Sequence, residues 1–185
     1  PAITGDLVLT GSDDGSVYAI GLQSGALAWS HKAADAVESS PCVAGGVVYV
    51  GAGDGTLLAL EAAGGRPRWT YKTGGKITGG PNVVKIGDRT LVVAGSHDAR
   101  LHAVDALTGT GVWTAAAAGF VNGTPAVVGD RVVFGGCDGL LRVVDAATGG
   151  VVHEIQAGSY IPGSPACDAE RAYVGQFGNE LLAAS

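Results

Sequence analysis

The sequence predicts an all-β fold assembled from a repeated unit of about 40 residues. Three features recur in step along the chain: a proline, a glycine that ends an apolar run, and a turn dipeptide after that glycine. The prolines are spaced by 40, 40, 44 and 40 residues, and the glycines by 40, 44, 40 and 40. The prolines are Pro1, Pro41, Pro81, Pro125 and Pro165, and the glycines are Gly11, Gly51, Gly95, Gly135 and Gly175.

Each unit reads as four short strands. The second unit begins with a short apolar segment after its proline and continues with a strand at Val47 to Val50. Asp54-Gly55 then predicts a tight hairpin turn, because both residues tolerate positive φ. The next strand alternates, with Leu57 and Ala59 on a strictly aliphatic face. A second glycine turn leads to a strand that carries Trp69.

Four strands in about 40 residues make one propeller blade. We therefore expect a β-propeller of four-stranded antiparallel blades, with about four and a half blades in a single domain. Because one blade cannot bury both of its faces, the chain is expected to belong to a larger ring. A closed five-bladed ring and a ring of two chains are alternatives, and open blade edges favour self-association. The domain spans residues 1–185, with repeats at 1–40, 41–80, 81–124 and 125–164 and a partial repeat at 165–185.

The third unit is four residues longer than the others. The additional residues fall within Val84–Thr90, between the first two strands of the unit. We predict a longer hairpin loop, because a loop can lengthen without disturbing the sheet. A small binding protrusion is the alternative, since loops often carry function.

The composition argues against several kinds of partner and site. The net charge is −6 and no basic cluster occurs, so nucleic acid is not an expected partner. Charged or glycine-rich turns interrupt every apolar run before it reaches the roughly 20 residues of a membrane-spanning helix. Cys42, Cys137 and Cys167 lack the spacing of metal ligands, and we interpret them as small buried apolar side chains.

A large aromatic residue recurs at one position of the fourth strand. Recurrence at a fixed site is better explained by packing between blades than by separate ligand sites. We therefore predict a structural docking role for Trp29, Trp69, Trp113 and, in the place of a fourth tryptophan, His153.

One segment resembles a known repeat family. From Ala103 to Trp113, the chain carries Asp105, Thr108 and Gly109 at the positions of the pattern A-x-D-x-x-T-G-x-x-x-W. This pattern resembles the tryptophan-docking motif of pyrroloquinoline-quinone (PQQ)-like propeller repeats, and the other units keep parts of it. The resemblance covers the whole chain. It implies a propeller, commonly of eight blades, in which each docking tryptophan packs against the adjacent blade.

The same family includes quinoprotein dehydrogenases, BamB-type outer-membrane assembly lipoproteins and sensor domains of bacterial kinases. A dehydrogenase would need PQQ, Ca²⁺ and a catalytic Asp. The adjacent Cys-Cys pair of the family's alcohol dehydrogenases does not occur here. The candidate aspartates occupy the same turn in each of the four complete units, which indicates a structural role: Asp14, Asp54, Asp98 and Asp138. We predict no catalytic residue, no metal site and no cofactor.

Positions that depart from the repeat are better candidates for function than positions that keep it. Asn122 and Tyr160 lie at the entries to first strands, which line the central channel in such propellers. His102 and Arg142 share a permissive position of the third strand. We name these four residues as speculative channel or ligand contacts, with a hydrogen-bonded or solvated side chain as the alternative for His102 and Arg142.

The sequence thus favours a non-catalytic scaffold that binds a protein or ligand in the bacterial cell envelope. The resemblance implies a location in the periplasm, at the outer membrane or outside the cell. The expected partner is another protein or the remaining blades of the same propeller. Two alternatives remain: part of a PQQ- and calcium-dependent alcohol or sugar dehydrogenase, and the sensor domain of a bacterial Ser/Thr kinase.

Overall fold

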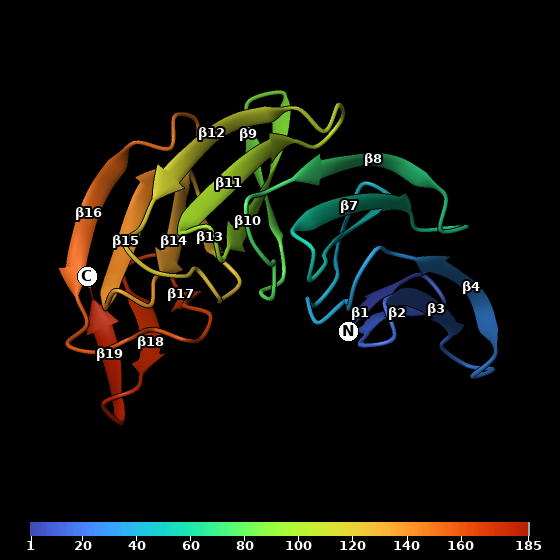
Figure 1. The fold of residues 1–185 in the computed structure, drawn as a ribbon. Helices are drawn as coiled ribbons and strands as arrows, with labels where there is room; N and C mark the ends of the chain where they lie inside the picture. Colours follow the sequence, from blue (N-terminus) through green and yellow to red (C-terminus); the bar gives the residue numbers. More distant parts are fainter. Residues whose placement is uncertain (185) are drawn as a thin grey trace.

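The computed structural model describes residues 1–184, which form five antiparallel sheets arranged along an arc (Figure 1). The first four sheets have four strands each and the fifth has three. Within every sheet, neighbouring strands are also consecutive in the chain. The predicted all-β fold of four-stranded antiparallel blades is therefore confirmed, and the sheets are called blades 1 to 5 in chain order.

The strand boundaries follow the predicted repeat. Blade 1 contains β1 (Ala2–Thr4), β2 (Leu7–Ser12), β3 (Ser16–Gly21) and β4 (Leu27–Lys32). Blade 2 contains β5 (Cys42–Ala44), β6 (Val47–Gly51), β7 (Thr56–Glu61) and β8 (Pro67–Lys72). Blade 3 contains β9 (Asn82–Ile86), β10 (Arg89–Ser96), β11 (Arg100–Asp105) and β12 (Gly111–Ala116). Blade 4 contains β13 (Ala126–Val128), β14 (Arg131–Gly135), β15 (Leu140–Asp145) and β16 (Val151–Gln156). Blade 5 contains β17 (Ala166–Cys167), β18 (Ala172–Gln176) and β19 (Glu180–Ala184).

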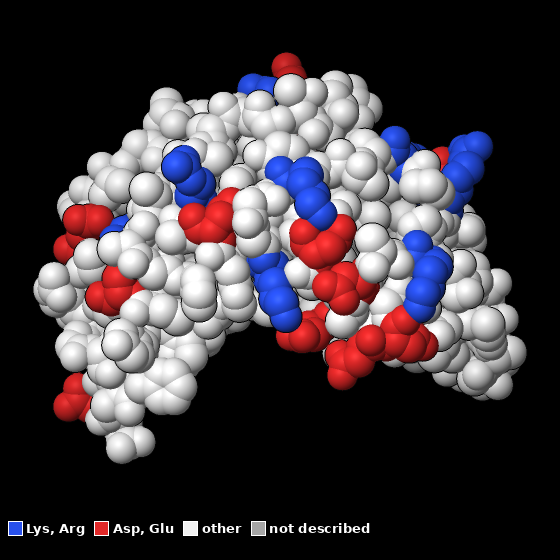
Figure 2. All heavy atoms as spheres, in the orientation of Figure 1, with Lys and Arg blue, Asp and Glu red and all other residues white. Residues whose placement is uncertain are grey.

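The first strand of each blade lies on the inner side of the arc. β1 contacts β5, β5 contacts β9, β9 contacts β13, and β13 contacts β17. Glycines before these strands allow the close approach, because a Cβ atom on Gly123 would lie 2.3 Å from the Gly163 carbonyl oxygen. Blades 1 and 5 lie at opposite ends of the arc, and the inner side is hollow in the space-filling view (Figures 1 and 2).

The core consists of apolar layers between neighbouring blades. Because side chains alternate along a strand, each blade contributes to the layers on both of its faces. In β7, Leu57 and Ala59 pack toward blade 3, whereas Leu58 and Leu60 pack toward blade 1. The end blades lack a neighbour on one face in the described chain. Leu181 of blade 5 is accordingly 75% exposed, whereas its counterpart Leu57 is fully buried.

The four additional residues of the third unit extend two strands rather than a loop, so the prediction of a longer loop is wrong. Ile86 pairs with Arg89, which leaves the two-residue turn Gly87-Asp88. Blade 2 has a turn of the same length, because Ala44 pairs with Val47. Two residues added to each strand preserve which side chains face the core, since the side-chain period is two. The β9–β10 hairpin therefore projects further than its counterparts.

Acidic and basic side chains lie next to one another on the face shown in Figure 2. The ion pairs of the structure include Arg89–Asp105 and Arg131–Asp145, with N–O distances of 2.9 and 2.8 Å. Among residues 1–184, no helix has the length and hydrophobicity needed to cross a bilayer.

Candidate functional site: a cleft between blades 2 and 3

Three tryptophans of the fourth strands reach the following blade. Trp69 Nε1 donates a hydrogen bond of 3.0 Å to the carbonyl oxygen of Ala106. A Cβ atom on Gly109 would lie 2.7 Å from the Trp69 ring, so a glycine is needed beneath the indole. Two pairs repeat this arrangement: Trp29 with Ala62 at 2.9 Å and Trp113 with Ala146 at 3.0 Å. Each tryptophan thus joins two blades through its ring and one hydrogen bond.

His153, at the corresponding position of blade 4, is exposed. It lines a second cavity of about 450 Å³ between blades 4 and 5, together with residues such as Glu154 and Arg171. Its predicted docking role stays a prediction.

His102 and Arg142 are buried, with exposed fractions of 5% and 4%. His102 Nε2 lies 3.0 Å from Asp98 Oδ2, and its Nδ1 lies 3.1 Å from the Tyr71 hydroxyl of the neighbouring blade. Arg142 donates to Asp138 at 2.6 Å and to Glu154 at 3.0 Å. Burial raises the pKa of Asp138, but the Arg142 guanidinium and backbone donors hold it below its usual value. Both side chains therefore bond to other residues of the chain.

Asn122 and Tyr160 lie in the loops that precede first strands. The Asn122 amide donates to the Cys137 sulfur at 3.3 Å, and its buried Oδ1 has no hydrogen-bond partner in the described chain. Tyr160 is 60% exposed. Neither they nor His102 and Arg142 line the two cavities described here. Ligand contact by these four residues stays a prediction.

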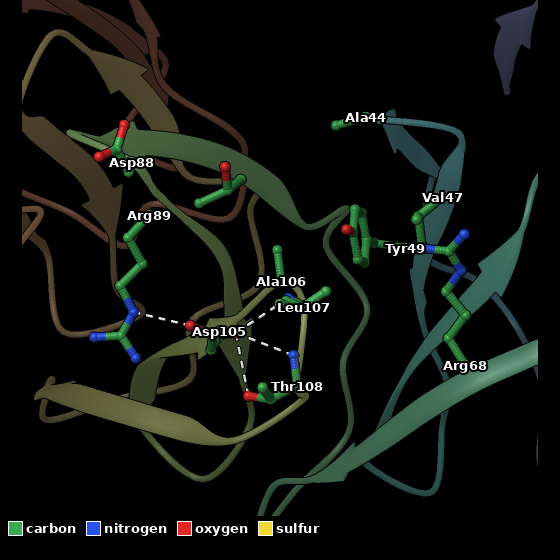
Figure 3. Close-up of a pocket in the computed structure, with 12 residues that line it drawn as sticks. Ala44, Val47, Tyr49, Arg68, Asp88, Arg89, Asp105, Ala106, Leu107 and Thr108 are labelled. Carbon is green, nitrogen blue, oxygen red and sulfur yellow. Dashed lines mark hydrogen bonds and ion pairs between the residues drawn. The ribbon is translucent and has the colours of Figure 1, made fainter.

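A cleft of about 620 Å³ opens between blades 2 and 3, and we call it the inter-blade cleft (Figure 3). The lengthened β9–β10 hairpin forms part of one wall, which extends into the turn between β11 and β12. The other wall belongs to blade 2. The blade 3 wall contains Asp88, Arg89, Thr90, Asp105, Ala106, Leu107 and Thr108, and the blade 2 wall contains Ala44, Gly45, Val47, Tyr49 and Arg68.

Polar groups on the blade 3 wall largely satisfy one another. Arg89 Nε donates to Asp105 Oδ2 at 2.9 Å. The other Asp105 oxygen accepts from the Leu107 and Thr108 amides at 3.1 and 3.0 Å and from the Thr108 hydroxyl at 3.1 Å. Arg89 first, and then these donors, lower the pKa of Asp105 to about 2. Asp105 is therefore ionised at neutral pH and holds this turn in place.

The blade 2 wall presents hydrogen-bond donors that are not satisfied by the described chain. The Tyr49 ring packs against Trp69, with centroids 5.7 Å apart, and Figure 3 shows its hydroxyl directed toward the cleft. Burial raises the pKa of Tyr49, which keeps the hydroxyl protonated at neutral pH although Arg68 opposes the shift. The nearest carboxylate to Arg68 is Glu61, at 3.8 Å. Glu61 already accepts two hydrogen bonds from Arg66, at 3.1 and 2.7 Å.

Sequence reasoning missed Tyr49 and Arg68, although a signal existed. Tyr49 occupies a core position that is Leu9, Val93 and Val133 in blades 1, 3 and 4, and Tyr173 in blade 5. Arg68 directly precedes the docking tryptophan, where the other three units have a small or branched aliphatic residue: Ala28, Val112 and Val152. A comparison of every repeat position for polar replacements at apolar sites would have found both residues.

The ionisable side chains that line the cleft are Tyr49, Arg68, Asp88, Arg89 and Asp105. Asp105, a carboxylate of the kind that can act as a general base, is held by Arg89 and by the donors of its own turn. In residues 1–184, no group of three or more His, Cys, Asp or Glu side chains is placed to hold a metal ion.

Comparisons with known structures support the propeller fold. A computationally designed protein, Ika8, matches 98% of the chain with a TM-score of 0.85 and 18% identity. BamB from Moraxella catarrhalis matches 98% with a TM-score of 0.81 and 23% identity. The chain spans 56% of each of these two proteins. A second designed protein, Ika4, matches 80% of the chain and 89% of its own length, with a TM-score of 0.69 and 18% identity.

No curated protein sequence matches the chain. A family profile described as outer membrane protein assembly factor BamB matches residues 1–80 and 73–185. These two matches together cover all five blades, and they agree with the PQQ-like repeat that the docking motif resembles. The chain therefore belongs to the BamB-like family of PQQ-type β-propeller repeats.

Proposed function

We propose that this chain is part of a non-catalytic propeller that binds a partner protein in the bacterial cell envelope. The observation that carries the proposal is the inter-blade cleft, in which Arg68 and the lengthened β9–β10 hairpin depart from the repeat and Tyr49 adds a hydroxyl at a position that is aliphatic in blades 1, 3 and 4. Departures that gather around one cavity, although they come from different strands, are expected of a binding site. The family description supports the envelope location, because BamB is named there as an outer membrane assembly factor.

Photo-crosslinking in the producing bacterium tests this proposal. A photoreactive benzoylphenylalanine replaces Leu107, which lies in the cleft lining and is 84% exposed. The matched control replaces Leu27 of blade 1, which is 60% exposed and does not line the cleft. We expect Leu107 to yield a crosslinked protein of one discrete mass that Leu27 does not. Identical products from both positions, or none from Leu107, would refute binding at the cleft.

The dehydrogenase alternative is tested on the intact protein by adding PQQ and Ca²⁺. A ligand that binds only the folded state raises the melting temperature. We expect no shift from PQQ with Ca²⁺. A saturable increase, accompanied by dye reduction with an alcohol or sugar substrate, would favour the dehydrogenase and contradict the non-catalytic assignment.

A further inference from the structure

We propose that the inter-blade cleft recognises a carboxylate side chain of an extended partner polypeptide, next to an apolar side chain of the same segment. The proposal deepens the binding function above and rests on it. It is carried by two uncommitted donors, Tyr49 and Arg68, on one wall and by apolar surface that continues over the rim.

The first requirement is an anion that accepts from both donors. The Tyr49 hydroxyl and the Arg68 guanidinium belong to the same wall, and neither forms a hydrogen bond within the described residues. Arg68 has its nearest carboxylate at 3.8 Å, beyond hydrogen-bond distance, and Arg66 engages that carboxylate more closely. A ligand carboxylate has two oxygens that can each accept a hydrogen bond, and its bond to the guanidinium is charge-assisted.

The opposite wall limits the ligand to one acidic group at this place. Arg89 is paired with Asp105 at 2.9 Å, so its charge is largely balanced within the chain. Asp88 lies at the turn of the β9–β10 hairpin, is exposed, and forms no ion pair with a Lys or Arg of residues 1–184. It would repel a second carboxylate on the blade 3 side. The single anion is therefore expected against blade 2.

The apolar surface favours a polypeptide over a small free acid. Ala44, Val47 and Ala106 supply methyl groups inside the cleft. Leu107 continues this surface to the rim, where it is 84% exposed. A small anion bound to Tyr49 and Arg68 would leave Leu107 in water, whereas a chain that crosses the rim covers it. Burial of that side chain adds roughly 25 cal/mol per Å² of apolar area removed from water.

A displayed library of random heptapeptides, selected on the intact protein, tests the proposal. We expect the selected peptides to share an Asp or Glu beside Leu, Ile, Val or Phe. The affinity of one selected peptide is then measured by fluorescence anisotropy, together with its Gln or Asn counterpart. Removing the carboxylate is expected to weaken binding about tenfold, as for a charge-assisted bond.

Variants of the protein locate the site. Arg68→Gln is expected to weaken binding of the acidic peptide about tenfold, and Tyr49→Phe about threefold, because the hydroxyl bond is neutral on the donor side. Arg100→Gln is the matched control, since it makes the same substitution at an exposed arginine of blade 3 that does not line the cleft. Leu107→Asp adds a repelling charge at an exposed site and serves as a second variant that does not depend on core packing. Circular dichroism establishes that each variant is folded.

Three results would overturn this inference. The selection would yield no acidic residue, or the acidic peptide would bind Arg68→Gln and Leu107→Asp as tightly as the unaltered protein. Alternatively, 3-phenylpropionate alone would bind as tightly as the selected peptide, which would indicate a small acid instead of a polypeptide. A crosslink from Leu107 combined with any of these results would leave the binding function standing and reject only the acidic partner. Absence of that crosslink would reject the binding function itself.

Discussion

Replacing Trp69 by Ala tests how strongly the indole holds blades 2 and 3 together. The change removes a ring that packs over Gly109 and a donor that lies 3.0 Å from the Ala106 carbonyl oxygen. Loss of a buried Trp side chain costs about 3–5 kcal/mol. Because Trp69 is only half-buried, we expect the lower limit, about 3 kcal/mol. For a chain of this size, about 1 kcal/mol lowers Tm by about 2–4 °C, so Tm should fall by about 6–12 °C.

Thermal melting followed by circular dichroism measures the effect without relying on tryptophan fluorescence. Trp69→Phe is the matched variant, because it retains an aromatic ring and removes the hydrogen bond. Its expected cost is about 1 kcal/mol. A Tm of Trp69→Ala within about 2 °C of the unaltered chain would refute the docking role, as it would mean less than about 1 kcal/mol of stabilisation.

Three further predictions follow from the same contacts. Gly109→Ala should lower Tm more than Gly45→Ala. Both glycines have positive φ (73° and 57°), but only at Gly109 would the new Cβ meet a side chain, because the Trp69 ring lies 2.7 Å away. Equal losses of Tm in the two variants would attribute the effect to the backbone alone. Asp105 has its pKa lowered to about 2 in the folded chain, so its stabilising contribution is present above about pH 4 and lost as the pH falls toward 2. The Tm of Asp105→Asn should therefore fall less steeply across that pH range than the Tm of the unaltered chain. The same dependence of Tm on pH in both proteins would contradict a stabilising role for the Asp105 carboxylate. Arg142→Ala should cost about 3–5 kcal/mol, because it leaves the buried Asp138 without its partner at 2.6 Å; denaturant unfolding should show recovery in the double variant Arg142→Leu, Asp138→Asn, and no recovery would place the loss in packing instead.

Much of the fold could be predicted because its signals are local. The turn at Asp54-Gly55 and the alternation of Leu57 and Ala59 depend on residues that are neighbours in the chain. The place of the additional residues in the third unit could not be predicted from local signals. The length of the unit identified an insertion, but only strand pairing between Ile86 and Arg89 shows that the additional residues extend the sheet.

The candidate site could be predicted only in part. Asn122, Tyr160, His102 and Arg142 were selected because they depart from the repeat, and none of them lines the inter-blade cleft. Departure alone does not separate a ligand contact from an internal partner. Arg142 departs from the repeat and pairs with Asp138 and Glu154, whereas Arg68 departs from it and has no carboxylate within hydrogen-bond distance.

The sequence by itself determined the period, the strands, the turns and the blade architecture, because each is encoded within one unit of about 40 residues and recurs in register. Only the tertiary structure decided which of the residues that depart from the repeat lie close together. Tyr49 and Arg68 share a cleft with Asp88 and Leu107 because two blades pack face to face. The width and depth of that cleft depend on the angle between the blades and on the projection of the β9–β10 hairpin. Neither the angle between the blades nor the projection of the hairpin can be derived from the residues of a single unit.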